Sequence, residues 1–263
     1  MPAHQADATR RLRELSRIEA AVCPRACATR CALTLLEPCG RETHIKEAMP
    51  PPSAREERRL LAFWQKCLKP GDCVAICGSA PSGTSARTLR KIFELARARR
   101  VHALIADANG PALETAGQMG LDGVKGNAAE IGAWLGLPGK LNPASRAHRI
   151  RLLRRLALKN APRAVLATLG AAGALFATSE TLLLAQAPCC ETPSKNTRQS
   201  ATGCGDAATA GWLWALLESG GPEDILRRAV ACGTAKLASP DPGTLDTRAL
   251  SALLCAVTPQ RLR

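Results

Sequence analysis

The stretch Thr202-Gly203-Cys204-Gly205-Asp206-Ala207-Ala208-Thr209-Ala210-Gly211 sets a glycine-rich turn directly before a segment that we expect to be helical from Ala207 to about Ser219. The two glycines let the backbone bend tightly and approach a ligand closely. The first amides of a helix lack acceptors within it and lie at the positive end of its dipole, so they favour an anion such as phosphate. A carboxylate there, Asp206, can take a proton from an attacking hydroxyl. The turn alone would equally fit an ordinary aspartate cap.

The middle of the chain repeats a unit of apolar strand, glycine-containing loop and helix. Such repeats predict a mostly parallel sheet in a three-layer α/β fold, with helices on both faces and ligands at the carboxyl ends of the strands. Every glycine-rich loop falls at such an end. Strands are expected at 72–77, 101–106, 123–125 and 164–168, a hairpin at 174–176 and 182–184, and helices at 86–99, 145–158, 222–237 and 247–257.

The first part of the chain has a different organisation. Residues 1–9 are expected to form a disordered tail, and 9–19 a helix with its apolar residues on one face. Residues 29–36 and 42–46 fit a two-stranded hairpin. Ser53 and Glu56 have the spacing of a capping box, which predicts that a helix starts after Ser53 and runs to about residue 68.

Composition limits the function classes. The 263 residues carry a formal charge of +14, which attracts phosphorylated ligands, nucleic acid or anionic lipid. The arginine excess is dispersed and aromatic residues are few, at 3%, which disfavours nucleic-acid binding. The sequence contains no run of about 18 apolar residues and no apolar leader, so we expect a cytoplasmic protein without a membrane span.

The 12 cysteines are expected to stay reduced in that compartment. Cys23, Cys27 and Cys31 are spaced four apart, which raises the possibility of zinc or an iron–sulfur cluster. However, tight C-x-x-C pairs and a histidine are missing from this segment, so a structural metal is disfavoured. Cys73 and Cys77 lie in an apolar strand and are expected in the core.

Several short motifs follow one another in a fixed order from about Arg10 to the end of the chain. They are Thr29-Arg30, Glu42-Thr43 with the prolines 50–52, Gly78-Ser79-Ala80-Pro81-Ser82-Gly83, Asp107 with Gly110, Lys125-Gly126-Asn127-Ala128-Ala129-Glu130, Thr168-Leu169-Gly170-Ala171-Ala172-Gly173, Thr202 to Asp206, and Asp241-Pro242-Gly243-Thr244. The set resembles the PfkB (ribokinase-like) carbohydrate kinases, in their branch of phosphofructokinases and tagatose-phosphate kinases.

This resemblance implies ATP- and Mg²⁺-dependent phosphoryl transfer to a hydroxyl of a sugar or sugar phosphate of the fructose or tagatose type. It implies that Asp206 is the general base and that the amides of Gly203, Cys204, Gly205 and Asp206 form an anion hole. It also implies nucleotide-binding roles for Lys125, Asn127, Thr168, Gly170, Gly173 and Gly233, an indirect Mg²⁺ role for Asn127 and Glu130, and substrate-binding roles for Arg30 and Ser79.

The chain departs from the family pattern at its start. The opening strand with a substrate-binding aspartate and the G-G-K-G-x-N-x-A segment have no counterpart, so we expect a shortened kinase domain at 10–263 with a lid remnant at about 29–47. Uncovered apolar faces would favour a homodimer. Three readings stay open: a shortened kinase, a remnant that binds nucleotide without transferring phosphate, and a basic nucleic-acid- or metal-binding protein on a kinase scaffold.

Overall fold

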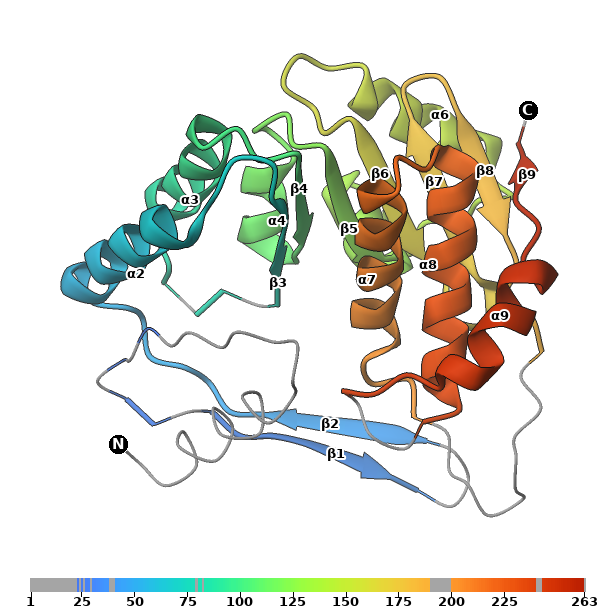
Figure 1. The fold of residues 1–263 in the computed structure, drawn as a ribbon, viewed down its shortest axis with the longest axis horizontal. Helices are drawn as coiled ribbons and strands as arrows, with labels where there is room; N and C mark the ends of the chain where they lie inside the picture. The colour runs from blue at the N-terminus through green and yellow to red at the C-terminus, as the bar shows by residue number, and fades with distance from the viewer. Residues whose placement is uncertain are drawn as a thin grey trace.

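The computed structural model describes residues 23, 25, 27–28, 30–37, 41–78, 80–81, 83–189, 200–239 and 243–262. Several sequence-based expectations lie outside these residues: the tail at 1–9, the helix at 9–19, Thr29, Ser79 and Asp241-Pro242. The described chain forms a seven-stranded sheet covered by helices, and a separate two-stranded hairpin (Figure 1).

The hairpin and the helix after it agree with the sequence analysis. Strands β1 (Ala32–Leu36) and β2 (Glu42–Lys46) pair in antiparallel fashion, with Leu36 opposite Glu42 at one end. Helix α2 (Ala54–Cys67) begins at the predicted capping box. The Glu56 carboxylate accepts the Ser53 amide at 2.8 Å, and the Ser53 hydroxyl accepts the Glu56 amide at 3.3 Å.

The large sheet has its strands in sequence order. The first four strands are parallel and the last three add antiparallel neighbours. The strands are β3 (Cys73–Cys77), β4 (Ala103–Asp107), β5 (Gly123–Asn127), β6 (Ala164–Thr168), β7 (Ala174–Thr178), β8 (Leu182–Ala185) and β9 (Gln260–Arg261).

Helices cover both faces of this sheet, which makes three layers. Because successive parallel strands are added in one direction, right-handed crossovers place their helices on one face. These helices are α3 (Ala86–Ala98), α4 (Gly110–Ala116), α5 (Ala128–Trp134) and α6 (Arg146–Leu156). The opposite face carries α7 (Cys204–Leu217), α8 (Pro222–Leu237) and α9 (Thr247–Ala256), shown in orange and red in Figure 1.

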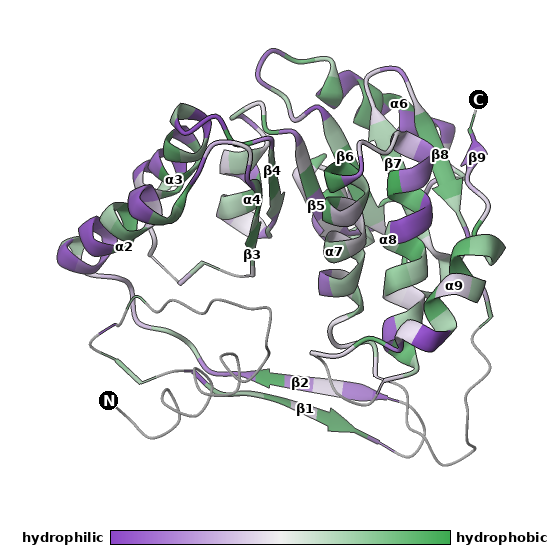
Figure 2. Cartoon of the chain, in the orientation of Figure 1, coloured by the Kyte–Doolittle hydropathy of each residue, from purple (hydrophilic) through white to green (hydrophobic). Residues whose placement is uncertain are grey.

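Strand β6 shows why these strands are apolar throughout. Val165 and Ala167 are buried in the core under α3 to α6, while Ala164 and Leu166 are buried in the core under α7 to α9. Since both faces of the sheet are covered, alternation of polar and apolar residues is lost. Figure 2 shows the result: hydrophobic strands inside and hydrophilic residues on the outward sides of the helices.

Three expectations were wrong in detail. Helix α7 begins at Cys204, three residues earlier than predicted, so the G-C-G-D turn forms its first turn. The two-residue strand β9 was not predicted, because a strand so short has no periodicity to detect. Cys73 is only partly buried and Cys77 is exposed, since β3 is an edge strand rather than a core strand.

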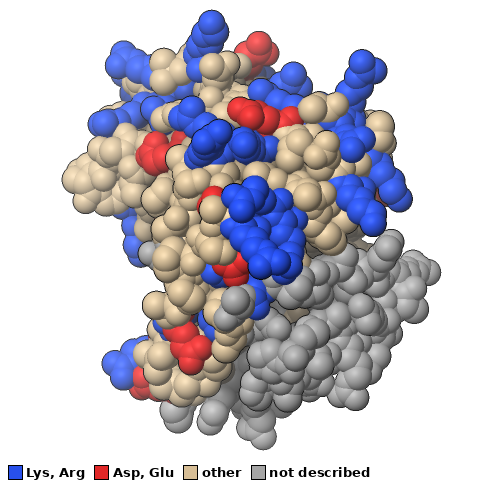
Figure 3. Space-filling model, turned by 90° about the vertical axis from the view of Figure 1, so that its left-hand side faces the viewer, with Lys and Arg blue, Asp and Glu red and all other residues tan. Residues whose placement is uncertain are grey.

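Basic residues are spread over the surface. On the side that carries α2 and α3, Lys and Arg form several separate groups with neutral surface between them (Figure 3). One group, Arg87, Arg90 and Lys91 of α3, borders a shallow recess. Within the described residues, none of the helices is both long and apolar enough to cross a membrane.

Candidate active site

The amino-terminal turn of α7 is the centre of the candidate site. Gly203 caps the helix with φ of +87°, a left-handed conformation that favours glycine. Asp206 lies in the first turn and is exposed. The Cys204 amide donates to the Ala201 carbonyl at 3.1 Å, so it is not available to a ligand and the predicted four-amide hole is too large by one. The amides of Gly203, Gly205 and Asp206 have no acceptor among the described residues.

The hairpin is held to this turn by one side chain. Glu42, the first residue of β2, accepts the Ala201 amide at 2.9 Å. Ala201 in turn accepts the Cys204 amide, so the hairpin, the loop before α7 and the helix start are linked by consecutive hydrogen bonds. The hairpin therefore faces the carboxyl side of the large sheet, as Figure 1 shows.

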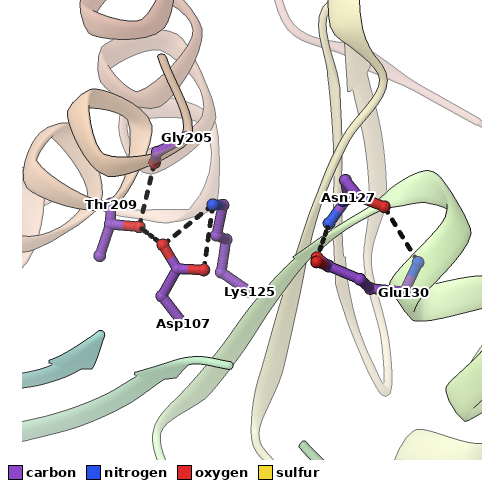
Figure 4. Close-up of polar contacts among 6 residues, drawn as sticks. All are labelled: Asp107, Lys125, Asn127, Glu130, Gly205 and Thr209. Atoms are coloured by element: carbon purple, nitrogen blue, oxygen red, sulfur yellow. Dashed lines mark hydrogen bonds and ion pairs between the residues drawn. The ribbon is translucent and has the colours of Figure 1, made fainter. Parts of the chain in front are cut away.

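A buried polar cluster lies beneath the same turn (Figure 4). The Lys125 ammonium of β5 donates to both carboxylate oxygens of Asp107, at 3.0 and 2.9 Å. The Thr209 hydroxyl of α7 lies 2.8 Å from Asp107 Oδ2 and 3.2 Å from the Gly205 carbonyl. These contacts join the carboxyl ends of β4 and β5 to the first turns of α7.

The pKa of the Cys77 thiol reflects the carboxylates that lie near this turn. Desolvation of the sulfur and the negative charges of Asp107 and Asp206 together raise the pKa of this thiol to about 11, although Cys77 as a whole residue is exposed. The Lys125 ammonium acts in the opposite direction. Hence the end of β3, the end of β4 and the first turn of α7 are electrostatic neighbours, although Cys77 itself is an unreactive thiol near neutral pH.

The N-x-x-E pair forms a helix cap at the start of α5. The Asn127 side-chain oxygen accepts the amides of Ala129 and Glu130, at 2.9 and 3.0 Å, and Glu130 Oε2 accepts the Asn127 amide at 2.7 Å (Figure 4). The cap leaves the Asn127 side-chain nitrogen and Glu130 Oε1 for other partners. Asn127 is exposed at the carboxyl edge of the sheet, in register with Thr168 of β6.

The predicted nucleotide-site glycines have different structural roles. Gly170 has φ of +64°, and open space surrounds the position of a side chain there. Gly173, with φ of +90°, packs directly on the Ala185 carbonyl, so its missing side chain is needed for packing against the end of β8. Gly233 lets α8 approach α7, because a Cβ there would lie 3.3 Å from the Cys204 carbonyl.

Comparison with known proteins fits this geometry. Residues 21–248 match the family model described as pfkB family carbohydrate kinase. The chain belongs to the PfkB family. It is 31% identical over 191 residues to a 1-phosphofructokinase of Rhodobacter capsulatus, and 28% identical over 205 residues to a 1-phosphofructokinase of Bacillus subtilis (strain 168). These alignments cover 73% and 78% of this chain, but only 57% and 63% of the two relatives.

Among solved structures, the PfkB-family chain is similar to phosphofructokinase-2 from Escherichia coli in complex with potassium. The TM-score is 0.73 at 22% identity, covering 86% of this chain and 70% of that one. At this identity the likeness supports the fold. It confirms the predicted ribokinase-like α/β architecture, with β1 and β2 as a hairpin apart from the sheet.

Arg30 lies at the start of the hairpin, at the end away from Glu42. It stands just before β1, whose far end, Leu36, pairs with Glu42. The six residue-to-residue steps from Arg30 to Leu36 span about 20 Å of extended chain. The guanidinium of Arg30 has no ion-pair partner among the described residues. Ser79, the other predicted substrate residue, lies outside them.

The cysteine-cluster hypothesis receives no support from the geometry. Among the described residues, which include Cys23, Cys27 and Cys31, no three His, Cys, Asp or Glu side chains come close enough to hold a metal ion.

Sequence reasoning missed two members of the polar cluster. Asp107 was noted only as part of a motif, and Thr209 only as part of the deciding stretch. The spacing of Thr209, four residues after Gly205, was the available signal, because positions i and i+4 share one face of a helix. The contact between Asp107 and Thr209 could not be read from the sequence, because 102 positions separate the two residues.

Proposed function

We propose that this protein transfers the terminal phosphoryl group of ATP to a hydroxyl of a sugar or sugar phosphate of the fructose or tagatose type. The observation that carries the proposal is the exposed carboxylate of Asp206 in the same helical turn as amides that have no acceptor among the described residues. Membership of the PfkB family and the names of the two 1-phosphofructokinase relatives support the choice of substrate class.

Asp206 acts as the general base. Its carboxylate takes the proton of the attacking hydroxyl, while the amides of Gly203, Gly205 and Asp206 donate to the oxygens of the phosphoryl group. Donors fixed in a helix turn need no reorganisation as charge develops, and the helix dipole adds positive potential at the same place. Phosphoryl transfer depends mainly on such positioning and charge stabilisation.

The residues present fit a Mg²⁺–nucleotide complex. Four of the assigned residues lie at the carboxyl ends of β5 and β6 or in the loop after β6: Lys125, Asn127, Thr168 and Gly170. A fifth, Gly233, lets α8 pack against the α7 turn. Glu130 keeps one carboxylate oxygen outside its cap, so it and Asn127 would hold the metal indirectly. When bound, Mg²⁺–ATP supplies the phosphoryl group and neutralises part of its charge.

The hairpin supplies the substrate side. We assign Arg30 to the phosphate of the sugar, because a guanidinium suits bidentate phosphate binding and this one has no ion-pair partner in the described chain. Ser79 belongs to the same proposal through its motif. Gly173, although part of the nucleotide motif, contributes through the packing of its loop.

We further propose a cytoplasmic homodimer. One face of the hairpin carries Leu33, Leu35 and Ile45, with 49%, 46% and 53% of their surfaces exposed. Leu33 and Ile45 are directly opposite in the register, so the three side chains form one apolar patch on the face opposite Glu42. Sedimentation of the parent and of L33E, with a monomer expected for the variant, checks this.

A coupled ADP-release assay with fructose 1-phosphate, fructose 6-phosphate and tagatose 6-phosphate tests the function. We expect turnover with at least one sugar, and a loss of about 100- to 10,000-fold in kcat for D206N with unchanged Mg²⁺–ADP binding. The matched control is E223Q, which removes an exposed carboxylate from the first turn of α8 and should behave like the parent. A D206N enzyme with parental kcat would remove Asp206 from the base role.

A second candidate is nucleotide binding without transfer. The chain spans less than two thirds of the length of its 1-phosphofructokinase relatives. If the protein only binds nucleotide, Mg²⁺–ATP raises the melting temperature, whereas no sugar phosphate does so and no ADP is released.

A further inference from the structure

The Lys125 ammonium has one donor to spare. It is 7% exposed, and two of its three N–H groups point to Asp107. The third has no acceptor among the described residues. A buried donor of this kind is costly unless a ligand or water satisfies it, so its surroundings indicate what it binds.

Those surroundings are the turn of α7. A Cβ built on Gly205 would lie 2.6 Å from Lys125 Nζ, so the ammonium rests directly against the backbone of the residue before Asp206. Figure 4 shows the lysine reaching from β5 to this turn. The ammonium therefore lies beside the backbone of Gly205, whose amide, like that of Asp206, has no acceptor among the described residues.

Asp107 fixes the lysine in that place. Its side chain is 12% exposed and accepts from Lys125 through both oxygens. The single hydroxyl proton of Thr209 goes to the nearer acceptor, Asp107 Oδ2, rather than to the more distant Gly205 carbonyl. The carboxylate thus ties β4, β5 and α7 together at the point where the ammonium meets the turn.

We propose that Asp107 is a positioning residue that acts through Lys125. It holds the ammonium against Gly205 so that the spare N–H and the amides of Gly205 and Asp206 address the same phosphoryl oxygens. The inference rests on the proposed function. It differs from a direct role, in which Asp107 would contact substrate or metal itself, because a positioning role disappears when the lysine is gone.

The test is a double-mutant cycle with D107N, K125M and D107N/K125M. We expect D107N to lower kcat/KM for Mg²⁺–ATP about 10- to 100-fold, the range for losing a hydrogen bond to a charged group. KM for the sugar phosphate should stay within about twofold of the parent. In the K125M background the same D107N change should have no further effect, because there is no ammonium left to position.

The control is D122N. Asp122 is another carboxylate of this sheet, at the opposite end of the strands, where it accepts the Leu104 amide at 2.9 Å and pairs with Arg163 at 3.2 Å. Its loss should leave the kinetics parental. If D107N does not fold, T209V keeps both charges, and should lower kcat/KM for Mg²⁺–ATP in the parent background but not with K125M.

Equal effects of D107N with and without Lys125, a parental D107N, or a raised KM for the sugar phosphate would each overturn the inference. Calorimetric Mg²⁺–ADP affinities of the same variants distinguish a failure of this inference from a failure of the proposed function. If the parent binds Mg²⁺–ADP but transfers nothing, the kinase proposal fails, while the same non-additive pattern in Kd upholds Asp107. A parent that neither binds nor transfers overturns both.

Discussion

Replacing Gly205 by alanine tests the packing on which the site depends. Gly205 is in the helical part of α7 and its φ is not positive, so intrinsic propensity favours alanine there by about 1 kcal/mol. The structure opposes this gain. The new methyl would lie 2.6 Å from Lys125 Nζ, where ordinary contacts begin at 3.4 Å, so the ammonium must retreat by about 0.8 Å.

The retreat acts on a buried ion pair. Lys125 is held at 2.9 and 3.0 Å by Asp107, and stretching these bonds removes part of an interaction worth about 1.5–3 kcal/mol for a charged partner. The two terms have opposite signs, and the loss is the larger one. We expect G205A to lower the free energy of unfolding by about 0.5–2 kcal/mol, which is large against a typical total of about 5–15 kcal/mol.

Urea unfolding followed by tryptophan fluorescence measures this change, and K125A provides the decisive background. Without the lysine only the helix propensity remains, so G205A should then stabilise the protein by about 1 kcal/mol. The predicted result is a reversal of sign between the two backgrounds. The same change in free energy, in sign and size, with and without Lys125 would refute the contact between the ammonium and the turn.

Two further predictions use other parts of the chain. S53A removes the side-chain acceptor that caps α2 and should lower the free energy of unfolding in urea by about 0.5–2 kcal/mol. The control S200A removes the hydroxyl that accepts the Thr202 amide in the loop before α7, and it should lower that free energy by less. Equal losses in the two variants would contradict the capping box. Desolvation and nearby carboxylates raise the pKa of Cys77 from 9.0 to about 11, so the rate at which iodoacetamide alkylates this thiol should keep rising with pH through this interval. D107N removes one of these negative charges and should increase the alkylation rate at pH 9. Peptide mass spectrometry measures both rates, and a plateau near pH 9 in the folded parent would contradict the assignment.

The local elements were readable from the sequence because short-range signals specify them. Ser53 and Glu56 form the capping box that their spacing predicted, and helix α8 has the predicted limits, Pro222–Leu237. The β7–β8 hairpin was found from two apolar runs with a turn between them. In each case the residues that decide the structure are neighbours in the chain.

Errors arose where a partner distant in sequence decides the outcome. Cys77 has the apolar neighbours of a core residue, but β3 is the sheet edge in the described structure, and an edge is a property of the whole sheet. The assignment of Asn127 and Glu130 to nucleotide and metal, made through their motif, stays a prediction, and the structure adds that both residues also cap the start of α5. Both roles fit the same spacing, which is why the motif alone does not separate them.

The sequence by itself determined the order of the strands from β1 to β8 and of the helices between them, and it identified the glycine-rich turn that carries Asp206 next to α7, because backbone bending and helix capping depend on adjacent residues. Only the tertiary structure decided that Asp107, Lys125 and Thr209 meet beneath that turn. Their side chains come from three separate elements, and a buried carboxylate and ammonium are brought within 3 Å only when β4, β5 and α7 pack together.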